Sequence, residues 1–178
     1  MAKIISVEAL KGKFVNLREV TTDDAEFILK LRCDEKKSRF LHKTEYNVEK
    51  QVEYIKNYLK KDNEWYFIIE NKEYKPLGTV RIYDVEGDKY TGGSWLMIDG
   101  ASPKETIEGD LLLKEYSFNV LNFSKNIFQV SKGNNKVIRY HKICGAEILS
   151  ENDLEYNFLL TKEMYIKNRD NLMRILGK

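Results

Sequence analysis

Residues 91–122 read TGGSWLMIDGASPKETIEGDLLLKEYSFNVLN, and this stretch decides the fold because it sets a strand directly before a capped helix. Residues 94–98 form a short apolar run that is typical of a strand. Ser102 supplies a side-chain cap, Pro103 takes the first helical position, and Glu105 follows three residues after the serine. A helix start leaves backbone N–H groups unpaired at the positive end of the dipole, which favours a phosphate or pyrophosphate. An ordinary strand-to-helix connection shares these features, because caps are common.

The composition indicates a single domain with a real core. The chain has 178 residues, of which 42% are hydrophobic and 12% aromatic. The formal net charge is only +2, so nucleic acid is not favoured as a partner. No run approaches the roughly 20 apolar residues of a membrane span, and we expect a soluble, cytoplasmic protein without membrane contact. Cys33 and Cys144 lack CxxC spacing, which predicts free thiols and no metal site.

Hydrophobic periodicity predicts the remaining elements in the order strand, two helices, three antiparallel strands, helix, strand, helix, two strands and helix. Strands are expected at residues 14–20, 64–70, 76–85, 90–98, 126–130, 146–149 and 156–161. Helices are expected to begin at residues 22, 48, 103 and 164 and after a cap at Asn134 or Asn135, with a loop or broken helix over 34–46. No linker or repeat divides the chain, which predicts one mixed α/β domain over residues 1–178.

This order of elements, together with the local sequence, resembles the GNAT N-acetyltransferase superfamily over nearly the whole chain. VNLREVTTDDAEFILKLR (15–32) is similar to the start of the family's domain, and YSFNVLNFSKNIFQVSKGNNKVIRYHKICGAEI (116–148) is similar to its helix, strand and second helix. Asn134 matches the family's asparagine and Gly145 its glycine. His141 falls where many members have a tyrosine that acts as general acid.

The resemblance implies a central, mostly antiparallel twisted sheet of about six or seven strands, flanked by helices and splayed at the cofactor site. It implies acetyl-CoA as acyl donor and direct attack of an amine on the thioester. The branch of the family is the one with ribosomal-protein alanine, spermidine and amino-sugar acetyltransferases. Tyr140, His141 and Lys142 are most similar to the sugar-modifying members.

The cofactor site follows from the same resemblance. The expected cofactor-binding residues are Leu96, Met97, Ile98, Lys104, Glu105, Thr106, Ile107, Glu108, Gly109 and Asn134. A backbone N–H near a bulge at residues 96–98 would donate to the oxyanion, and this strand would splay from residues 126–130 to admit the pantetheine arm. The family's Q/R-x-x-G-x-G/A pattern is missing, since Lys104, Glu105 and Thr106 occupy the place of its glycines. These side chains crowd the approach to the pyrophosphate, although Lys104 adds a charge that can meet phosphate.

The expected catalytic residue is His141, whose ordinary pKa near 6.5 suits proton transfer. A helix histidine that only packs or forms a hydrogen bond is the alternative. Acceptor binding is expected from Arg39, His42, Ser94 and Trp95. For Arg39 and His42 the alternative is a solvated basic loop, and for Trp95 it is a place in the core.

The expected function is N-acetylation of a primary amine on a small acceptor, with a nucleotide-linked amino sugar as one candidate. An enzyme acting on a protein N-terminus or a polyamine is the second hypothesis. The basic loop at residues 39–44 favours an anionic acceptor over a polyamine. A catalytically silent acyl-CoA-binding module is the third hypothesis, because the glycine pattern is missing. The partner is expected to be the small acceptor, and the protein a monomer or homodimer.

Overall fold

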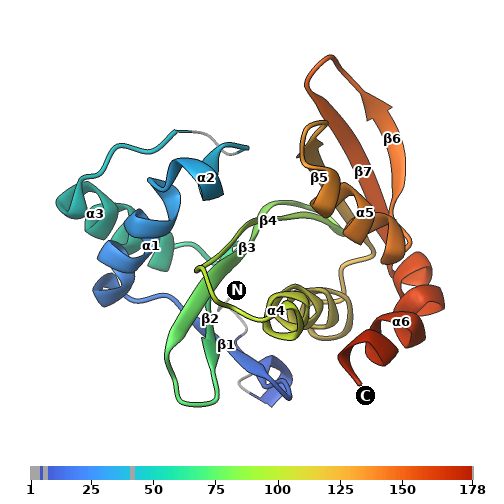
Figure 1. Ribbon diagram of the computed structural model, residues 1–178, viewed down its shortest axis with the longest axis horizontal. Helices are drawn as coiled ribbons and strands as arrows, with labels where there is room; N and C mark the ends of the chain where they lie inside the picture. The colour runs from blue at the N-terminus through green and yellow to red at the C-terminus, as the bar shows by residue number, and fades with distance from the viewer. Residues whose placement is uncertain (1–4, 6–7, 41–42, 178) are drawn as a thin grey trace.

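A seven-stranded sheet forms the centre of the molecule in the computed structural model, which describes residues 5, 8–40 and 43–177 (Figure 1). The strands are β1 (Val15–Glu19), β2 (Trp65–Asn71), β3 (Pro76–Glu86), β4 (Lys89–Met97), β5 (Lys125–Ser131), β6 (Glu147–Glu151) and β7 (Glu155–Thr161). Their order in space is β1-β2-β3-β4-β5-β7-β6, and every neighbouring pair is antiparallel except β4 and β5. The expected mixed α/β fold with a mostly antiparallel sheet is confirmed.

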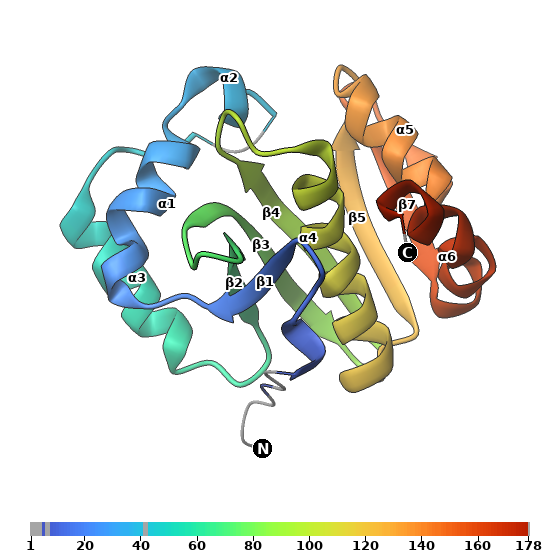
Figure 2. The same cartoon turned by 60° about the horizontal axis from the view of Figure 1, so that its bottom comes forward.

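Helices cover both faces of this sheet (Figure 2). They are η1 (Glu8–Leu10), η2 (Thr22–Asp24), α1 (Ala25–Arg32), α2 (Glu35–Ser38), α3 (Val48–Leu59), α4 (Pro103–Glu115) with its π-helical extension η3 (Tyr116–Val120), α5 (Asn135–Ile143) and α6 (Lys162–Leu176). Ile28 of α1 and Ile55 of α3 pack with Ile68 of β2 in one core. Leu111 of α4 belongs to a larger core on the other face, to which α6 contributes Leu172.

The local signals in the sequence explain where the helices begin. Ser102 Oγ accepts the N–H of Glu105, and the Glu105 carboxylate accepts the N–H of Ser102 at 2.7 Å, so the expected capping box is present. The irregular stretch expected after α1 contains the short helix α2. Helix α6 begins two residues earlier than expected, because Thr161 Oγ1 caps it by accepting the N–H of Met164 at 3.2 Å.

Helix α4 is fastened to the first two strands by Glu108 and Gly109. The carboxylate of Glu108 is buried and accepts the backbone N–H groups of three consecutive residues, Lys13, Phe14 and Val15, at 2.9, 2.5 and 2.9 Å. At Gly109 a Cβ atom would lie only 2.7 Å from the Cδ1 of Ile69, so glycine lets the helix lie close to β2. These contacts fix the direction in which α4 runs across the sheet.

Replacement of Glu108 by alanine should therefore destabilise the fold. The variant leaves three backbone donors without their carboxylate, and a buried unsatisfied group costs about 1–3 kcal/mol. We expect the free energy of unfolding to fall by about 3 kcal/mol in urea denaturation. Glu26→Ala removes an exposed carboxylate that pairs with Lys30 on α1, and should change the free energy of unfolding by less than about 0.5 kcal/mol. Equal effects of the two variants would contradict this role of Glu108.

Candidate active site

Strands β4 and β5 run parallel but are paired over only two positions. Lys89 and Tyr90 of β4 form the ladder with the start of β5. The Asn126 side chain then takes the place of a ladder partner, because its Oδ1 accepts the N–H of Gly92 at 3.0 Å. Within the described residues the two strands separate from this point onward, so a gap opens in the middle of the sheet. The splay that the resemblance predicts is present.

A β-bulge in β4 lies beside this gap. Ser94 and Trp95 together oppose the single residue Val80 of β3. Ser94 has φ of +51°, a left-handed conformation that is uncommon outside glycine, and its carbonyl accepts the hydroxyl of Thr79 at 2.7 Å. A bulge bends its strand and increases the local twist, which carries β4 away from β5. The bulge comes just before residues 96–98, near which the resemblance placed it.

The bulge also leaves a backbone donor directed at the gap. Ile98 donates its N–H to the carbonyl of Leu77 on β3 at 2.7 Å. Successive N–H groups of a strand point to opposite sides. The N–H of Met97 is therefore directed toward β5, where the strand pairing has ended.

Two cavities meet at the gap. The first, which we call the channel, has a volume of about 110 Å³ and is lined from both faces of the sheet. Its lining includes Phe40, Ser94, Trp95, Asp110, Asn134 and His141. The second, which we call the groove, has a volume of about 470 Å³ between the start of α4 and α5. Its lining is mostly apolar and consists of Trp95, Met97, Ala101, Pro103, Thr106, Ile107, Lys136, Val137 and Tyr140. Trp95 borders both, so the groove leads into the channel.

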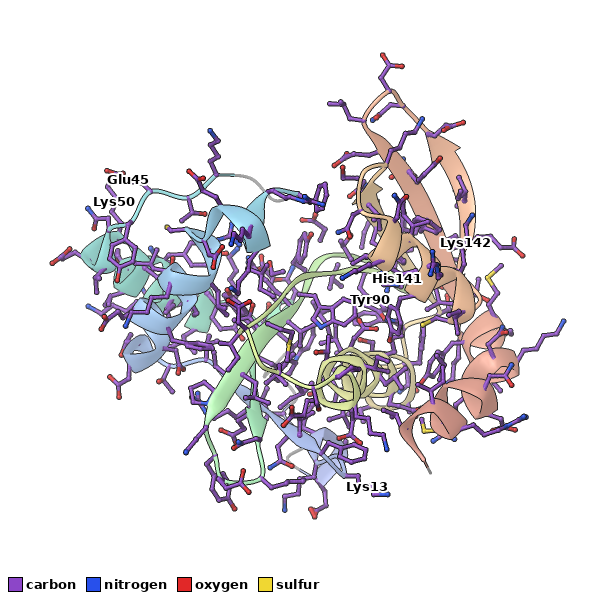
Figure 3. The ribbon with its side chains drawn as sticks, viewed as in Figure 1. Lys13, Glu45, Lys50, Tyr90, His141 and Lys142 are labelled. Atoms are coloured by element: carbon purple, nitrogen blue, oxygen red, sulfur yellow. The ribbon has the colours of Figure 1, made fainter. Side chains whose placement is uncertain are left out.

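His141 lies on α5, where Figure 3 labels it, and its side chain lines the channel. Its ring lies 4.4 Å from that of Phe128 and 6.2 Å from that of Trp95, measured between centroids. The Nδ1 atom is buried and has no hydrogen-bond partner among the described residues. Burial, together with the positive charge of Lys114, lowers the pKa of His141 to about 3. The expectation that this histidine titrates near its ordinary pKa is therefore wrong, because the ring is held neutral by its surroundings.

A buried ion pair on α4 lies behind the histidine. Asp110 and Lys114 are spaced one helical turn apart and form a salt bridge, with both side chains buried. The hydroxyl of Tyr140 donates to Asp110 Oδ2 at 2.6 Å. Burial alone would raise the pKa of Asp110, but the charge and hydrogen bond of Lys114 hold it below its ordinary value. The pair thus keeps both charges in the interior and fixes Tyr140 at the end of the groove.

The geometry agrees with comparisons to known proteins. A family model described as "Acetyltransferase (GNAT) domain" matches residues 15–147. The chain belongs to this family. A solved structure described as apo FdhC, a nucleotide-linked sugar GNAT, is 35% identical to the chain, covers 94% of it and 98% of its own length, and superimposes with a TM-score of 0.84. No curated protein matches the sequence.

More distant GNAT structures share the fold. A spermidine N-acetyltransferase from Vibrio cholerae, solved in complex with CoA and spermine, is 18% identical, with 85% of this chain and 98% of that one covered and a TM-score of 0.73. A mutant form of the SpeG spermidine N-acetyltransferase from the same organism is 16% identical, with 88% and 98% covered and a TM-score of 0.74. The family is one of acetyltransferases that use acetyl-CoA, and the chain is accordingly an N-acetyltransferase.

The residues predicted to bind the cofactor divide between the groove and other places in this GNAT domain. Met97, Thr106 and Ile107 line the groove, and Asn134 lines the channel. Asn134 stands at the N-cap of α5 without a side-chain capping bond, so its amide is not used to start the helix. Lys136 also lines the groove and belongs to no motif of the sequence, although its position two residues after Asn134 places it at the same helix start.

The other predicted cofactor residues lie away from the groove lining. Leu96 is buried in the sheet, Glu105 caps α4, and Glu108 and Gly109 face β1 and β2. Lys104 lies one turn before Glu108, and its Nζ is 5.3 Å from the centre of the Phe14 ring. A helix turns about 100° per residue, so neighbouring positions on α4 point to different surroundings.

Of the predicted acceptor residues, Ser94 and Trp95 line the channel, and Trp95 also borders the groove. The Arg39 guanidinium stacks 4.3 Å from the ring of Phe40, which lines the channel as well. The ring of Trp95 lies 5.1 Å from the ring of Tyr140. His42 lies outside the described residues.

Two further observations concern the described part of the chain as a whole. Among the described residues, no group of three or more His, Cys, Asp or Glu side chains is arranged to hold a metal ion. The helices in the described part of the chain fall short of the length and hydropathy that crossing a bilayer requires.

The low pKa of His141 predicts how its resonances respond to pH. In the free enzyme the imidazole should stay neutral between about pH 8 and pH 5 in a heteronuclear NMR titration, with the peak assigned through a His42→Gln variant. The unfolded chain has an ordinary histidine, so stability is full above about pH 6.5 and falls as pH decreases toward 3. A titration midpoint above about pH 6 for His141 would contradict its burial as a neutral ring.

Proposed function

We propose that this GNAT transfers the acetyl group of acetyl-CoA to the primary amine of a small acceptor, and that the acceptor is a nucleotide-linked amino sugar. The proposal is carried by the gap between β4 and β5, where the groove on one side of the sheet meets a channel lined from both sides. Two reactants can therefore meet through the sheet, each approaching from its own face. Such an arrangement aligns them before reaction, which is the main requirement for direct transfer.

The groove has the properties that a CoA molecule requires. Its apolar walls suit the pantetheine arm, and it begins at the N-terminal turn of α4, where the helix dipole favours phosphate. Lys136 adds a positive charge to the lining and is a better placed phosphate partner than Lys104. The bound acetyl-CoA would supply an activated thioester. The N–H of Met97 would then stabilise the oxyanion that forms on the carbonyl oxygen.

His141 is the group in the channel that we assign to proton transfer. Its ring is neutral in the free enzyme, and the negative charge that would develop on the carbonyl oxygen and on the thiolate during transfer raises the pKa of the ring. The ring could then take the proton that the amine loses and give it to the leaving thiolate. The Nδ1 atom is buried without a hydrogen-bond partner among the described residues, and a bound reactant could supply that partner. Asp110, which accepts the hydroxyl of Tyr140, holds the Lys114 ammonium in place behind the ring. Asn134 lines the same channel and is proposed to contact the cofactor.

The sugar-nucleotide acceptor is supported by the similarity to FdhC, whose description names a nucleotide-linked sugar GNAT. The spermidine acetyltransferases share under a fifth of their residues with this chain and support the fold alone. Arg39 and Ser94 are proposed as acceptor contacts at the mouth of the channel. A cytoplasmic location and a monomeric or dimeric state remain part of the proposal.

A thiol-release assay tests the function. With acetyl-CoA present, we expect release of CoA in the presence of a nucleotide-linked amino sugar and much slower release with spermidine or a peptide N-terminus. His141→Ala should lower kcat by about 100-fold and leave the Kd for acetyl-CoA within about twofold, because proton transfer contributes to the chemical step and little to binding. Lys142→Ala, an exposed neighbour on α5, is the matched control.

The outcomes separate the competing functions. Binding of acetyl-CoA without turnover on any amine would support the silent binding module instead. Absence of acetyl-CoA binding would remove the cofactor from the account altogether. An unchanged kcat in His141→Ala would remove the histidine from the mechanism.

A further inference from the structure

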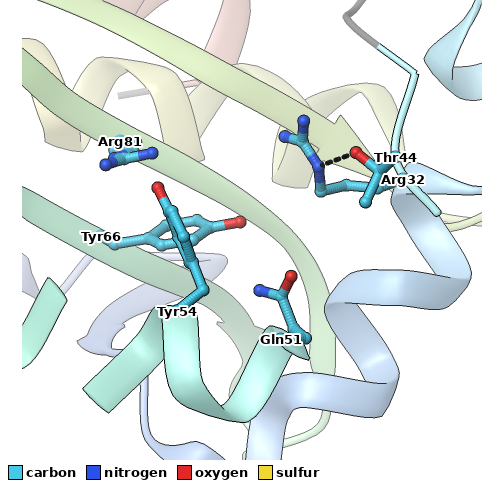
Figure 4. A pocket seen from close by; sticks show the side chains of 6 residues that line it. All are labelled: Arg32, Thr44, Gln51, Tyr54, Tyr66 and Arg81. Atoms are coloured by element: carbon cyan, nitrogen blue, oxygen red, sulfur yellow. Dashed lines mark hydrogen bonds between the residues drawn. The ribbon is translucent and has the colours of Figure 1, made fainter. Parts of the chain in front are cut away.

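A third cavity, polar in character, lies on the α1 and α3 side of the sheet. It has a volume of about 210 Å³ and is lined by Arg32, Thr44, Gln51, Tyr54, Tyr66 and Arg81 (Figure 4). The lining side chains converge from α1, α3, β2, β3 and the loop before α3. Tyr66 belongs to the core under α1 and α3, so the cavity opens on the face opposite to α4. None of these six residues takes part in the groove or the channel described above.

Arg81 provides a fixed cation in this cavity. Its guanidinium pairs with Glu64 and lies 5.3–5.5 Å from the rings of Tyr54, Tyr66 and Tyr83. The Nε atom is buried and has no hydrogen-bond partner among the described residues. Buried polar groups without a partner are rare, since each costs desolvation free energy. An incoming acceptor oxygen would satisfy this donor.

Arg32 supplies a second guanidinium to the same cavity. Its Nε donates to Thr44 Oγ1 at 2.9 Å, and no ion pair with a carboxylate is found for it among the described residues. Among the described residues, Glu64 is the one carboxylate that forms an ion pair with a side chain lining the cavity. It is shared between Arg81 and Lys61. Burial raises the pKa of Tyr66 to about 12, so that hydroxyl stays neutral. The cavity thus carries an excess of positive charge, and a guanidinium group matches the oxygens of a phosphate.

The cavity lies one strand away from the channel. Arg81 on β3 is the register partner of Gly93 on β4, which lines the channel. Thr79, two residues before Arg81, donates to the carbonyl of Ser94 in the bulge. Neighbouring strands are about 4.8 Å apart. A molecule of sugar-phosphate size can therefore hold an anionic group in the cavity and an amine at the channel.

We propose that Arg32 and Arg81 bind the phosphoryl part of the acceptor, which makes this cavity a recognition subsite for phosphate-bearing amines. The proposal rests on the proposed function for its amine, whereas the recognition of the anion can be measured separately. The loop that the sequence marked as basic reaches the subsite through Thr44. The two cations themselves come from α1 and β3, where the sequence offered no signal.

Calorimetry on the full chain saturated with CoA tests the subsite, because CoA then occupies its own phosphate positions. Uridine diphosphate should bind, and uridine, which lacks phosphate, should not. Arg32→Ala should weaken the binding of uridine diphosphate by about tenfold or more, since a charge-assisted contact is lost. Lys30→Ala removes one exposed positive charge from the same helix and should change the Kd by less than about twofold.

A second variant guards against a folding defect. Arg81→Lys keeps the positive charge beside Glu64 but removes the planar set of guanidinium N–H donors. It should also raise the Kd for uridine diphosphate several-fold, while the Tm stays within a few degrees of the wild-type value. Binding of inorganic phosphate as tight as that of uridine diphosphate would identify a free-anion site and overturn the acceptor subsite. Equal affinity of wild type and Arg32→Ala would overturn it as well.

Activity distinguishes the failure of this subsite from the failure of the proposed function. The kcat/KM for a nucleotide-linked amino sugar should exceed that for the free amino sugar, and Arg32→Ala should reduce this ratio by about tenfold. Binding of uridine diphosphate through Arg32 without acetylation of any amine would overturn the function and support the subsite. Acetylation that is equally fast with and without the phosphate would support the function and overturn the subsite.

Discussion

The structure depends on the early end of hydrogen bonding between β4 and β5. Two parallel strands that stayed paired along their length would close the sheet and leave no site. The ladder stops after Tyr90, and side chains take over the backbone partners: Asn126 accepts the N–H of Gly92, and Thr91 donates to the Ile127 carbonyl at 2.8 Å. These bonds satisfy the backbone at the edge of the gap. Further along, the bulge carries β4 away, and its open edge becomes available for a ligand.

Helix α4 joins the two halves of the sheet across this gap and must be held firmly. Its start is fixed by the capping box and by the hydrogen bonds from three backbone N–H groups to Glu108, and its middle by the close approach of Gly109 to β2. The ion pair of Asp110 and Lys114 begins at the next residue of the same helix and spans one turn. Because this pair and the aromatic rings enclose His141, the packing that supports the gap also sets the protonation state of the histidine. The contacts that hold α4 in place are therefore also the contacts that keep the His141 ring neutral.

The sequence predicts the fold well because most of its signals are local. Caps, glycine ends and alternating patterns placed nearly every element within about two residues, and the resemblance supplied the gap and the position of His141. Side-chain directions and tertiary burial could not be obtained in this way. The directions of the Lys104 and Trp95 side chains depend on how helix α4 and strand β4 are rotated about their axes in the packed fold. The pKa of His141 depends on its burial and on Lys114, which is distant in sequence. Arg32 and Arg81 line the same cavity only once α1 has packed against the sheet that contains β3.

The central claim is that transfer takes place at the gap between β4 and β5, and a crystal structure of the complex with CoA tests it most directly. The account predicts the CoA sulfur in the channel, within hydrogen-bond reach of His141 and the Met97 N–H, with the phosphates at the start of α4 beside Lys136. A sulfur outside the channel, or phosphates bound on the Phe14 side of α4, would contradict it.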